Sequence, residues 1–133
     1  MADIYHQEAA EHLIESYNAL DGLPGQPFTH CEILFYYDGP KGFWFTTSDD
    51  RALLVQAADE TDEDYVELGA FVTPEALAEA LRGDVPFREP WTNASAEDLY
   101  LIHYPVDDDI EVWVEHAPHP LPESMLPTPE ARL

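Results

Sequence analysis

The chain has 133 residues, a length that fits one domain with a sizeable hydrophobic core. Hydrophobic residues make up 45% of the chain and aromatic residues 12%, which is typical of a globular protein and argues against disorder. Against 28 acidic residues stand only 5 lysines and arginines, a net charge of −23 that argues against direct binding to nucleic acid or to an anionic membrane.

The N-terminal segment predicts an amphipathic helix from Asp3 to about Leu20, because apolar residues recur at helical spacing and Gly22 follows. The opposite face carries the acidic stripe Glu8, Glu11 and Glu15, without lysine or arginine at the compensating positions. This stripe indicates either a solvated face or a row of carboxylates that a cationic protein binds. The segment lacks the basic start and the apolar run of a secretory signal, and no run in the sequence reaches membrane-spanning length, so we expect a cytoplasmic protein.

Residues 31–47 predict an antiparallel hairpin, since two runs of aromatic and β-branched residues flank the turn-forming segment 38–42. Both faces of its first strand carry apolar side chains, which favours a central place in a sheet. Cys31 begins this strand and has no second cysteine to pair with. We expect it to be a small buried side chain and not a nucleophile.

Two further strands are predicted at 52–58 and 65–72, separated by the densest acidic run of the chain. A helix is the alternative for 52–58, but the pattern favours a strand. We expect this run to form the loop between the two strands. Its acids are Asp59, Glu60, Asp62, Glu63 and Asp64.

A second helix is predicted to follow Thr73 and to run from Glu75 to Arg82, because a capping hydroxyl precedes a proline and a carboxylate. Gly83 ends it. We expect segment 84–93 to be ordered but non-regular. Trp91, within it, is expected either in the core or, if it is exposed among acids, as an anchor for a protein partner.

The last third predicts a second hairpin, 99–104 with 110–115, around an acidic turn of Asp107, Asp108 and Asp109. Ile110, Val112 and Val114 are expected to face the core. From Ala117 onward five prolines exclude a helix or a central strand. We therefore expect residues 117–133 to form an extended or partly disordered tail outside the domain.

This order of elements, with short links, predicts an α+β domain over residues 1–116. The expected architecture is an antiparallel sheet of five to six strands with the N-terminal and central helices packed on one face.

Motifs for catalysis or for cofactor binding do not occur in the sequence. The six histidines lack the spacing of a zinc site, and the acidic runs lack the spaced ligands and central glycine of a calcium-binding EF-hand loop. Segment 38–42 joins two strands and does not begin a helix, so the basis for a phosphate cradle is missing. We expect no metal, no cofactor and no enzymatic activity.

Four motifs between residues 31 and 91 carry a resemblance to a known family. They are the aromatic strand Phe43-Trp44-Phe45-Thr46-Thr47, the helix start Val72-Thr73-Pro74-Glu75-Ala76-Leu77, the pair Ala80-Leu81 and the pair Pro90-Trp91. This pattern resembles the small immunity proteins of bacterial polymorphic toxin systems, in particular those paired with secreted deaminases and nucleases. The resemblance implies a protein without enzymatic activity that occludes the active site of a cationic toxin.

The charge predicts the same class for a separate reason, since an enzyme that acts on nucleic acid presents a basic cleft that an acidic domain can fill. The expected partner is a basic protein, and its expected contacts are the three acidic segments and Trp91. The alternative is a salt-adapted cytoplasmic binding or chaperone-like adaptor domain, in which the acids serve solubility and say nothing of partners.

Overall fold

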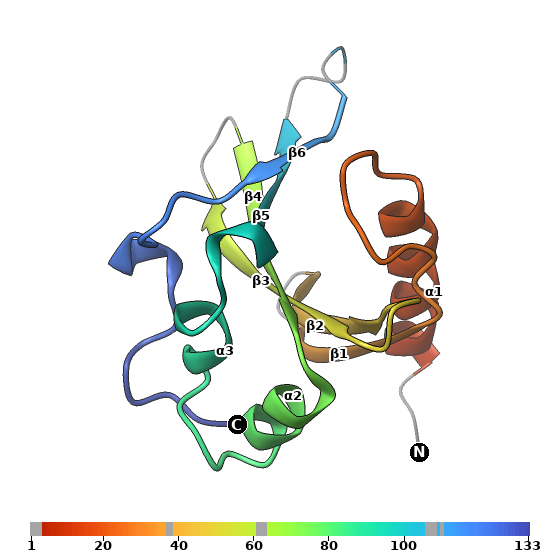
Figure 1. Ribbon diagram of the computed structural model, residues 1–133. Helices are drawn as coiled ribbons and strands as arrows, with labels where there is room; N and C mark the ends of the chain where they lie inside the picture. The colour runs from red at the N-terminus through yellow and green to blue at the C-terminus, as the bar shows by residue number, and fades with distance from the viewer. Residues whose placement is uncertain (1–3, 37–38, 61–63, 106–108, 110) are drawn as a thin grey trace.

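The computed structural model describes residues 4–36, 39–60, 64–105, 109 and 111–133. Its frame is a six-stranded antiparallel sheet with the strands in sequence order (Figure 1). The strands are β1 (His30–Tyr36), β2 (Pro40–Thr46), β3 (Ala52–Glu60), β4 (Asp64–Val72), β5 (Leu99–Pro105) and β6 (Trp113–His116). Because neighbouring strands are antiparallel, β1, β3 and β5 end where β2, β4 and β6 begin, at one end of the sheet.

The helices cover both faces of this sheet. One face carries α1 (Ile4–Asn18), and the other carries α2 (Pro74–Leu81), the single-turn helix α3 (Glu89–Thr92) and the C-terminal segment (Figure 1). The α+β class and the six antiparallel strands are confirmed, but the expectation that the helices share one face is wrong. Both faces need a cover because apolar side chains alternate without a polar face in the middle strands, as Leu53 and Leu54 do on β3.

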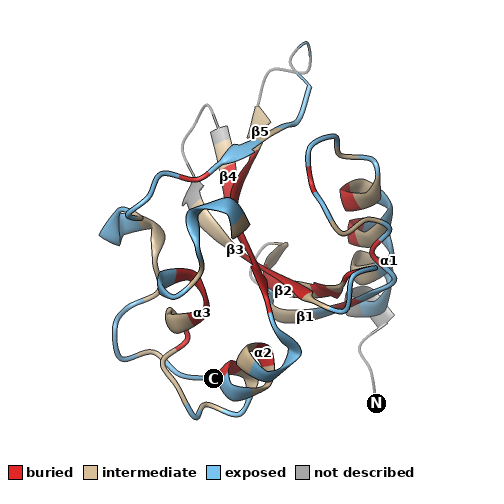
Figure 2. Cartoon of the chain, viewed as in Figure 1, coloured by how far each residue is buried: buried red, intermediate tan, exposed pale blue. Residues whose placement is uncertain are grey.

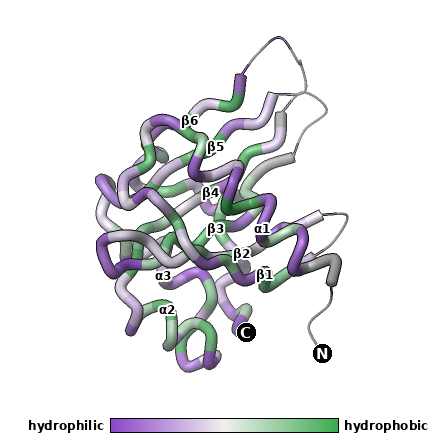
Figure 3. The backbone as a smooth tube through the Cα atoms, turned by 90° about the vertical axis from the view of Figure 1, so that its right-hand side faces the viewer, coloured by the Kyte–Doolittle hydropathy of each residue, from purple (hydrophilic) through white to green (hydrophobic). Residues whose placement is uncertain are grey.

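The first core lies between α1 and the sheet. Tyr17 of α1 is fully buried, and its ring centroid is 4.7 Å from that of Phe45 on β2. The Phe28 ring stacks on Phe45 at 5.2 Å and meets the Tyr17 ring edge-on at 6.4 Å. Figure 2 shows buried residues along the inner strands and on the side of α1 that faces them. Hydrophobic and hydrophilic residues alternate along α1 in Figure 3, as expected for a helix with one face on a sheet.

The second core lies under α2 and α3. Trp91 is fully buried there, with its ring edge-on to Phe87 at a centroid distance of 5.1 Å. Helix α2 begins as predicted, since the Thr73 hydroxyl oxygen accepts a hydrogen bond from the Ala76 amide at 3.1 Å. Gly83 follows the helix with a φ of +75°, a conformation that suits glycine. Segment 84–93 departs from the expectation only in containing the helical turn α3.

The hairpin 31–47 forms as predicted, but β1 lies at the edge of the sheet and not at its centre. Register shifts between Ile33 and Tyr36 break the alternation of side chains on β1. Phe35 consequently reaches the second face, where its ring meets that of Phe87 at 5.4 Å. It also covers Gly42, where a Cβ would lie only 2.5 Å from the Phe35 ring. Phe35 and Tyr36 remain 42% and 48% exposed.

The second hairpin is shorter than predicted, because β6 begins only at Trp113. Val114 packs against the first core, whereas Val112 is exposed, so its predicted place in the core is wrong. The prediction for Ile110 lies outside the described residues. Of the described helices, none is long and apolar enough to cross a membrane.

Residues 117–133 lack strands, as predicted, but they are packed on the second core and do not form a separate tail. Ala117 is buried, and Met125 and Leu126 lie against the same core. The Phe87 amide donates a hydrogen bond to the Ala131 carbonyl at 2.7 Å, and the Gln56 amide group donates to the Met125 carbonyl at 2.7 Å. The segment after the expected boundary at residue 116 thus shares the second face of the sheet with α2 and α3.

Candidate functional site

The sheet topology brings acidic residues from distant parts of the chain to one end of the sheet. Asp59 and Glu60 are the last residues of β3, and Asp64 is the first of β4, paired with Pro105 at the end of β5. Asp109, which follows β5 in the chain, is exposed. We call the strand ends with Asp59, Glu60 and Asp64, together with Asp109, the acidic end of the sheet.

This arrangement corrects the predicted acidic loop 59–64. Asp59, Glu60 and Asp64 belong to the strands β3 and β4, because the ladder continues beyond the apolar run that predicted the strands. Asp62, Glu63, Asp107 and Asp108 lie outside the described residues. The stripe Glu8, Glu11 and Glu15 is exposed on α1, in agreement with a solvated face.

Trp91 does not belong to a partner surface, since none of its surface is exposed. The prediction that Trp91 anchors a protein partner is therefore wrong, and the alternative that it lies in the core is confirmed. It lies on α3, which begins at Glu89, and packs in the second core between this helical turn and the sheet.

The five basic side chains are used inside the molecule. Arg51 forms ion pairs with Asp49 at 2.8 Å and Asp98 at 3.0 Å. Its guanidinium, with the Thr47 hydroxyl, lowers the pKa of Asp49 to about 2. The other four make contacts of three kinds: Arg82 pairs with Asp84, Arg88 and Arg132 bind tail or loop carbonyls, and the Lys41 ammonium lies over the Tyr65 ring.

A buried carboxyl lies beneath the acidic end, on the face that α1 covers. Glu67 of β4 is only 3% exposed, and the Tyr17 hydroxyl donates a hydrogen bond to its Oε1 at 2.6 Å. The Tyr104 hydroxyl also hydrogen-bonds this carboxyl. Burial raises the pKa of Glu67 to about 7, against the opposing effect of these hydrogen bonds.

Glu67 borders an open cavity of about 350 Å³ between α1, the start of β2 and strands β4 and β5. We call it the Glu67 cavity. The Tyr65 and Tyr104 rings form one wall, with centroids 5.8 Å apart. The α1 residues that line it include His12 and Ser16, and β2 contributes Lys41.

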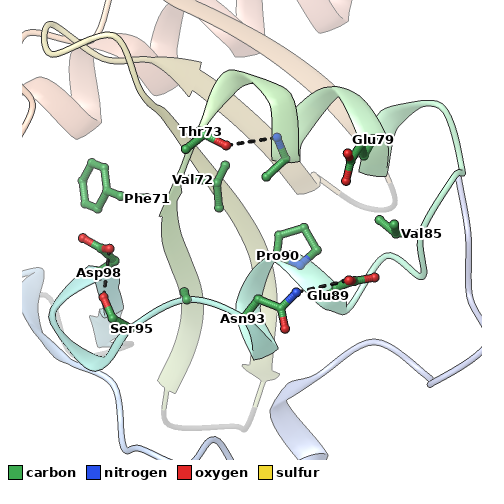
Figure 4. Close-up of a pocket in the computed structure, with 12 residues that line it drawn as sticks. Phe71, Val72, Thr73, Glu79, Val85, Glu89, Pro90, Asn93, Ser95 and Asp98 are labelled. Carbon is green, nitrogen blue, oxygen red and sulfur yellow. Dashed lines mark hydrogen bonds between the residues drawn. The ribbon is translucent and has the colours of Figure 1, made fainter.

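A second hollow of about 340 Å³ lies between α2, α3 and β4 (Figure 4). Its carboxylates are those of Glu79, Glu89 and Asp98. Two of these accept hydrogen bonds from neighbouring side chains, Glu89 from the Asn93 amide at 3.1 Å and Asp98 from the Ser95 hydroxyl at 3.0 Å. Because its polar groups are turned to one another, this hollow is a weaker candidate for a ligand than the Glu67 cavity.

The described residues do not form a metal site, and the one cysteine is not placed as a reactive thiol. Within the described part of the chain, no group of three or more histidine, cysteine, aspartate or glutamate side chains could hold a metal ion. Cys31 is buried as predicted, and burial raises the pKa of its thiol to about 12, which disfavours the reactive thiolate.

The sequence reasoning missed Glu67, although a signal for it exists. On the predicted strand 65–72, Glu67 lies on the same face as Tyr65 and Phe71. Phe71 belongs to the first core, so this face is directed to the core. A lone carboxylate on a core-facing register marks a buried titratable group.

Comparisons with protein-family models, with curated proteins and with solved structures find no match for this chain.

Proposed function

We propose that this protein is a non-enzymatic acidic binding protein that docks on a basic protein and occludes its cationic site. This is the function that the resemblance to toxin immunity proteins implies. The observation that carries the proposal is the distribution of charged residues. The five basic side chains make internal contacts, while acidic positions of β3 and β4 meet at one end of the sheet. We include a cytoplasmic location in the proposal.

Electrostatics explain how such a surface acts. A negative end of a molecule with net charge −23 attracts a basic cleft over distances comparable to the Debye length, about 10 Å at 0.1 M salt. Complementary charge accelerates association and disfavours acidic partners. A protein that fills a nucleic-acid-binding cleft in this way competes with the phosphate backbone for the same cations.

The test starts from the native host. The chain is used to capture proteins from its lysate, and the captured basic protein is then purified and its dissociation constant measured at low and high salt. We expect inhibition of that protein's activity and weaker binding at high salt. Equal affinity at the two salt concentrations, or capture of acidic proteins alone, would contradict the proposal.

A matched pair of variants locates the docking surface. Replacing Asp59, Glu60 and Asp64 with their amides should weaken binding about tenfold or more, because close charge pairs across interfaces are lost. The control replaces Glu75, Glu79 and Glu130, which are exposed and lie on α2 or in the C-terminal segment, and so removes the same charge. Equal losses in both triple variants would show that net charge alone acts, without a docking end.

One observation favours a second candidate, the salt-adapted adaptor domain. Exposed acids also occur far from the acidic end, along α1 and at Glu75, Glu123 and Glu130. A surface that is acidic everywhere is what solvation in concentrated salt requires. The two candidates differ in how stability depends on salt.

A further inference from the structure

The lining of the Glu67 cavity favours a cation over other ligands. Its base is a carboxyl, and its wall is made of the Tyr65 and Tyr104 rings, whose faces attract positive charge. The chain's own Lys41 demonstrates this preference, because its Nζ lies 4.8 Å from the centroid of the Tyr65 ring. An anionic ligand would be repelled by Glu67 and by the net charge of −23.

The geometry further narrows the kind of cation. A hard metal ion takes six or more oxygen ligands, including carboxylates, whereas Glu67 is the one carboxylate among the described residues that line this cavity. A guanidinium binds best with both carboxylate oxygens in a fork, but Oε1 of Glu67 already accepts the Tyr17 hydroxyl. An ammonium group has compact, rotatable donors and can use the remaining lone pairs of Glu67 together with the Ser16 hydroxyl on the α1 side.

Size agrees with a small group. A volume of about 350 Å³ is at the lower end of the range for ligand pockets, about 300 to 1,000 Å³. It accommodates a short alkyl chain that packs between Leu13 of α1 and the tyrosine rings, with the charged end directed to the carboxyl.

We infer that the Glu67 cavity is a binding site for a primary alkylammonium group, supplied either by a free small amine or by a lysine side chain of another protein. Glu67 is its anionic partner, Tyr65 and Tyr104 enclose its alkyl and ammonium parts, and Lys41 competes for the same wall. This site is separate from docking at the acidic end and does not depend on it.

The test uses n-butylammonium chloride as the probe for a free amine, and a capped tripeptide Gly-Lys-Gly as the probe for a lysine side chain. Binding is followed by the ring resonances of Tyr65 and Tyr104 in NMR titrations, with n-butanol as a neutral control of the same shape. We expect saturable shifts of these rings with at least one of the two amines and none with butanol. The amine that binds more tightly identifies the source.

Three variants make the outcome decisive. Glu67→Gln should weaken amine binding about tenfold or more, since it removes a charge-assisted hydrogen bond. Lys41→Met should tighten binding, because it removes the competing ammonium. Glu75→Gln removes the same charge as Glu67→Gln from exposed α2 and should leave affinity unchanged.

Circular dichroism confirms that each variant is folded before titration. Shifts that saturate equally in Glu67→Gln and in the native chain would overturn the inference, as would the absence of shifts with both amines in the native chain and in Lys41→Met. If Glu67→Gln does not fold, Tyr104→Phe replaces it. That variant keeps the ring and loses the hydroxyl that orients the carboxyl, so unchanged affinity in it would also overturn the inference.

Discussion

Two carboxyl groups of this chain experience opposite environments. Burial raises the pKa of Glu67 to about 7, whereas Arg51 and Thr47 lower the pKa of Asp49 to about 2. Glu67 is held among Tyr17 of α1, Lys41 of β2 and Tyr104 of β5, and it is protonated in part at neutral pH. Asp49 is exposed and stays ionised. Of these two carboxyls, the one whose protonation changes near neutral pH is therefore in the core and not on the surface.

The pH dependence of stability follows from this shift. The folded-state pKa of Glu67 lies above the ordinary value of 4.5, so the folded chain holds the proton more tightly than the unfolded chain between the two values. The free energy of unfolding supplied by this group is present below about pH 4.5 and is lost as pH rises through about 7. The neutral variant Glu67→Gln should not lose it.

Urea unfolding of both proteins from pH 4.5 to pH 8 checks this prediction. The difference in unfolding free energy, variant minus native, should increase with pH by at most about 3 kcal/mol, at about 1.4 kcal/mol for each unit of pKa shift. Other carboxyls, Asp49 included, are common to both proteins and cancel. A difference that is constant across this range would show that Glu67 ionises normally in the folded state.

Only some residues of the acidic end and of the Glu67 cavity could be predicted from the sequence. The acids Asp59, Glu60 and Asp64 stand out as a charge run, and the strand that carries Glu67 is predicted by its apolar neighbours. What the sequence does not supply is the set of partners: Tyr17 lies 50 residues away from Glu67 and meets it only because α1 packs on this face. Trp91 shows the reverse case, since its proline-rich surroundings indicate a loop but the indole fills the core.

Among the elements, the C-terminal segment differs most from its predicted role. Its prolines leave it only one short 3-10 helix, Glu123–Met125. Arg88, whose side chain is 17% exposed, holds the segment through the Pro127 carbonyl at 2.9 Å and the Glu123 carboxylate. Proline content fixes the extended form of a segment but not whether it finds a surface. The second face of the sheet supplies that surface, through Leu121, Met125 and Leu126.

Arg88→Met should therefore cost about 1–3 kcal/mol of unfolding free energy, because a part-buried guanidinium loses bonds to a carbonyl and a carboxylate. Arg82→Met is the matched control: the Arg82 side chain is 60% exposed and pairs with the exposed Asp84, an interaction worth about 0–1 kcal/mol. Urea unfolding gives both values, and hydrogen exchange shows whether the Phe87 amide loses protection. Equal costs for the two variants would mean that Arg88 does not hold the segment.

The strands and helices were predictable where local pattern decides. Helix α2 follows from Thr73 and Pro74, and the hairpin of β1 and β2 follows from the segment 38–42. The edge position of β1 was not predictable, because apolar residues on both faces suit an inner strand equally well. The bulge at Phe35, which places its ring over Gly42, depends on contacts with Phe87 that local sequence does not specify.

Considered as a whole, the molecule is a sheet with a core on each face and a strongly negative surface. The internal use of Arg51, Arg82, Arg88 and Arg132 leaves the exposed carboxylates with few counter-charges. Repulsion among them opposes the compact state and is relieved by salt. How much salt is needed distinguishes the two candidate functions.

Thermal unfolding in potassium chloride measures this property. For an acidic docking protein we expect the melting temperature to rise between about 0.02 M and about 0.3 M salt and then to level off, as the Debye length falls below the spacing of surface charges. Sodium sulfate is not used in place of the chloride, because sulfate also stabilises buried apolar surface and would raise the melting temperature for a second reason. A melting temperature that continues to climb through molar chloride would favour the salt-adapted domain and count against partner docking as the reason for the acidity.

Lys41 is the one lysine of the chain, and its ammonium lies over the Tyr65 ring. Acylation of a side chain can therefore occur only beside this ring. Acetyl transfer, ubiquitin-like conjugation or an amine-reactive dye has no other side-chain amine to use. Any of these modifications would neutralise one of five positive charges and release the Tyr65 ring from its ammonium. A single covalent event at this residue thus alters the wall of the Glu67 cavity and the charge of the nearby acidic end together.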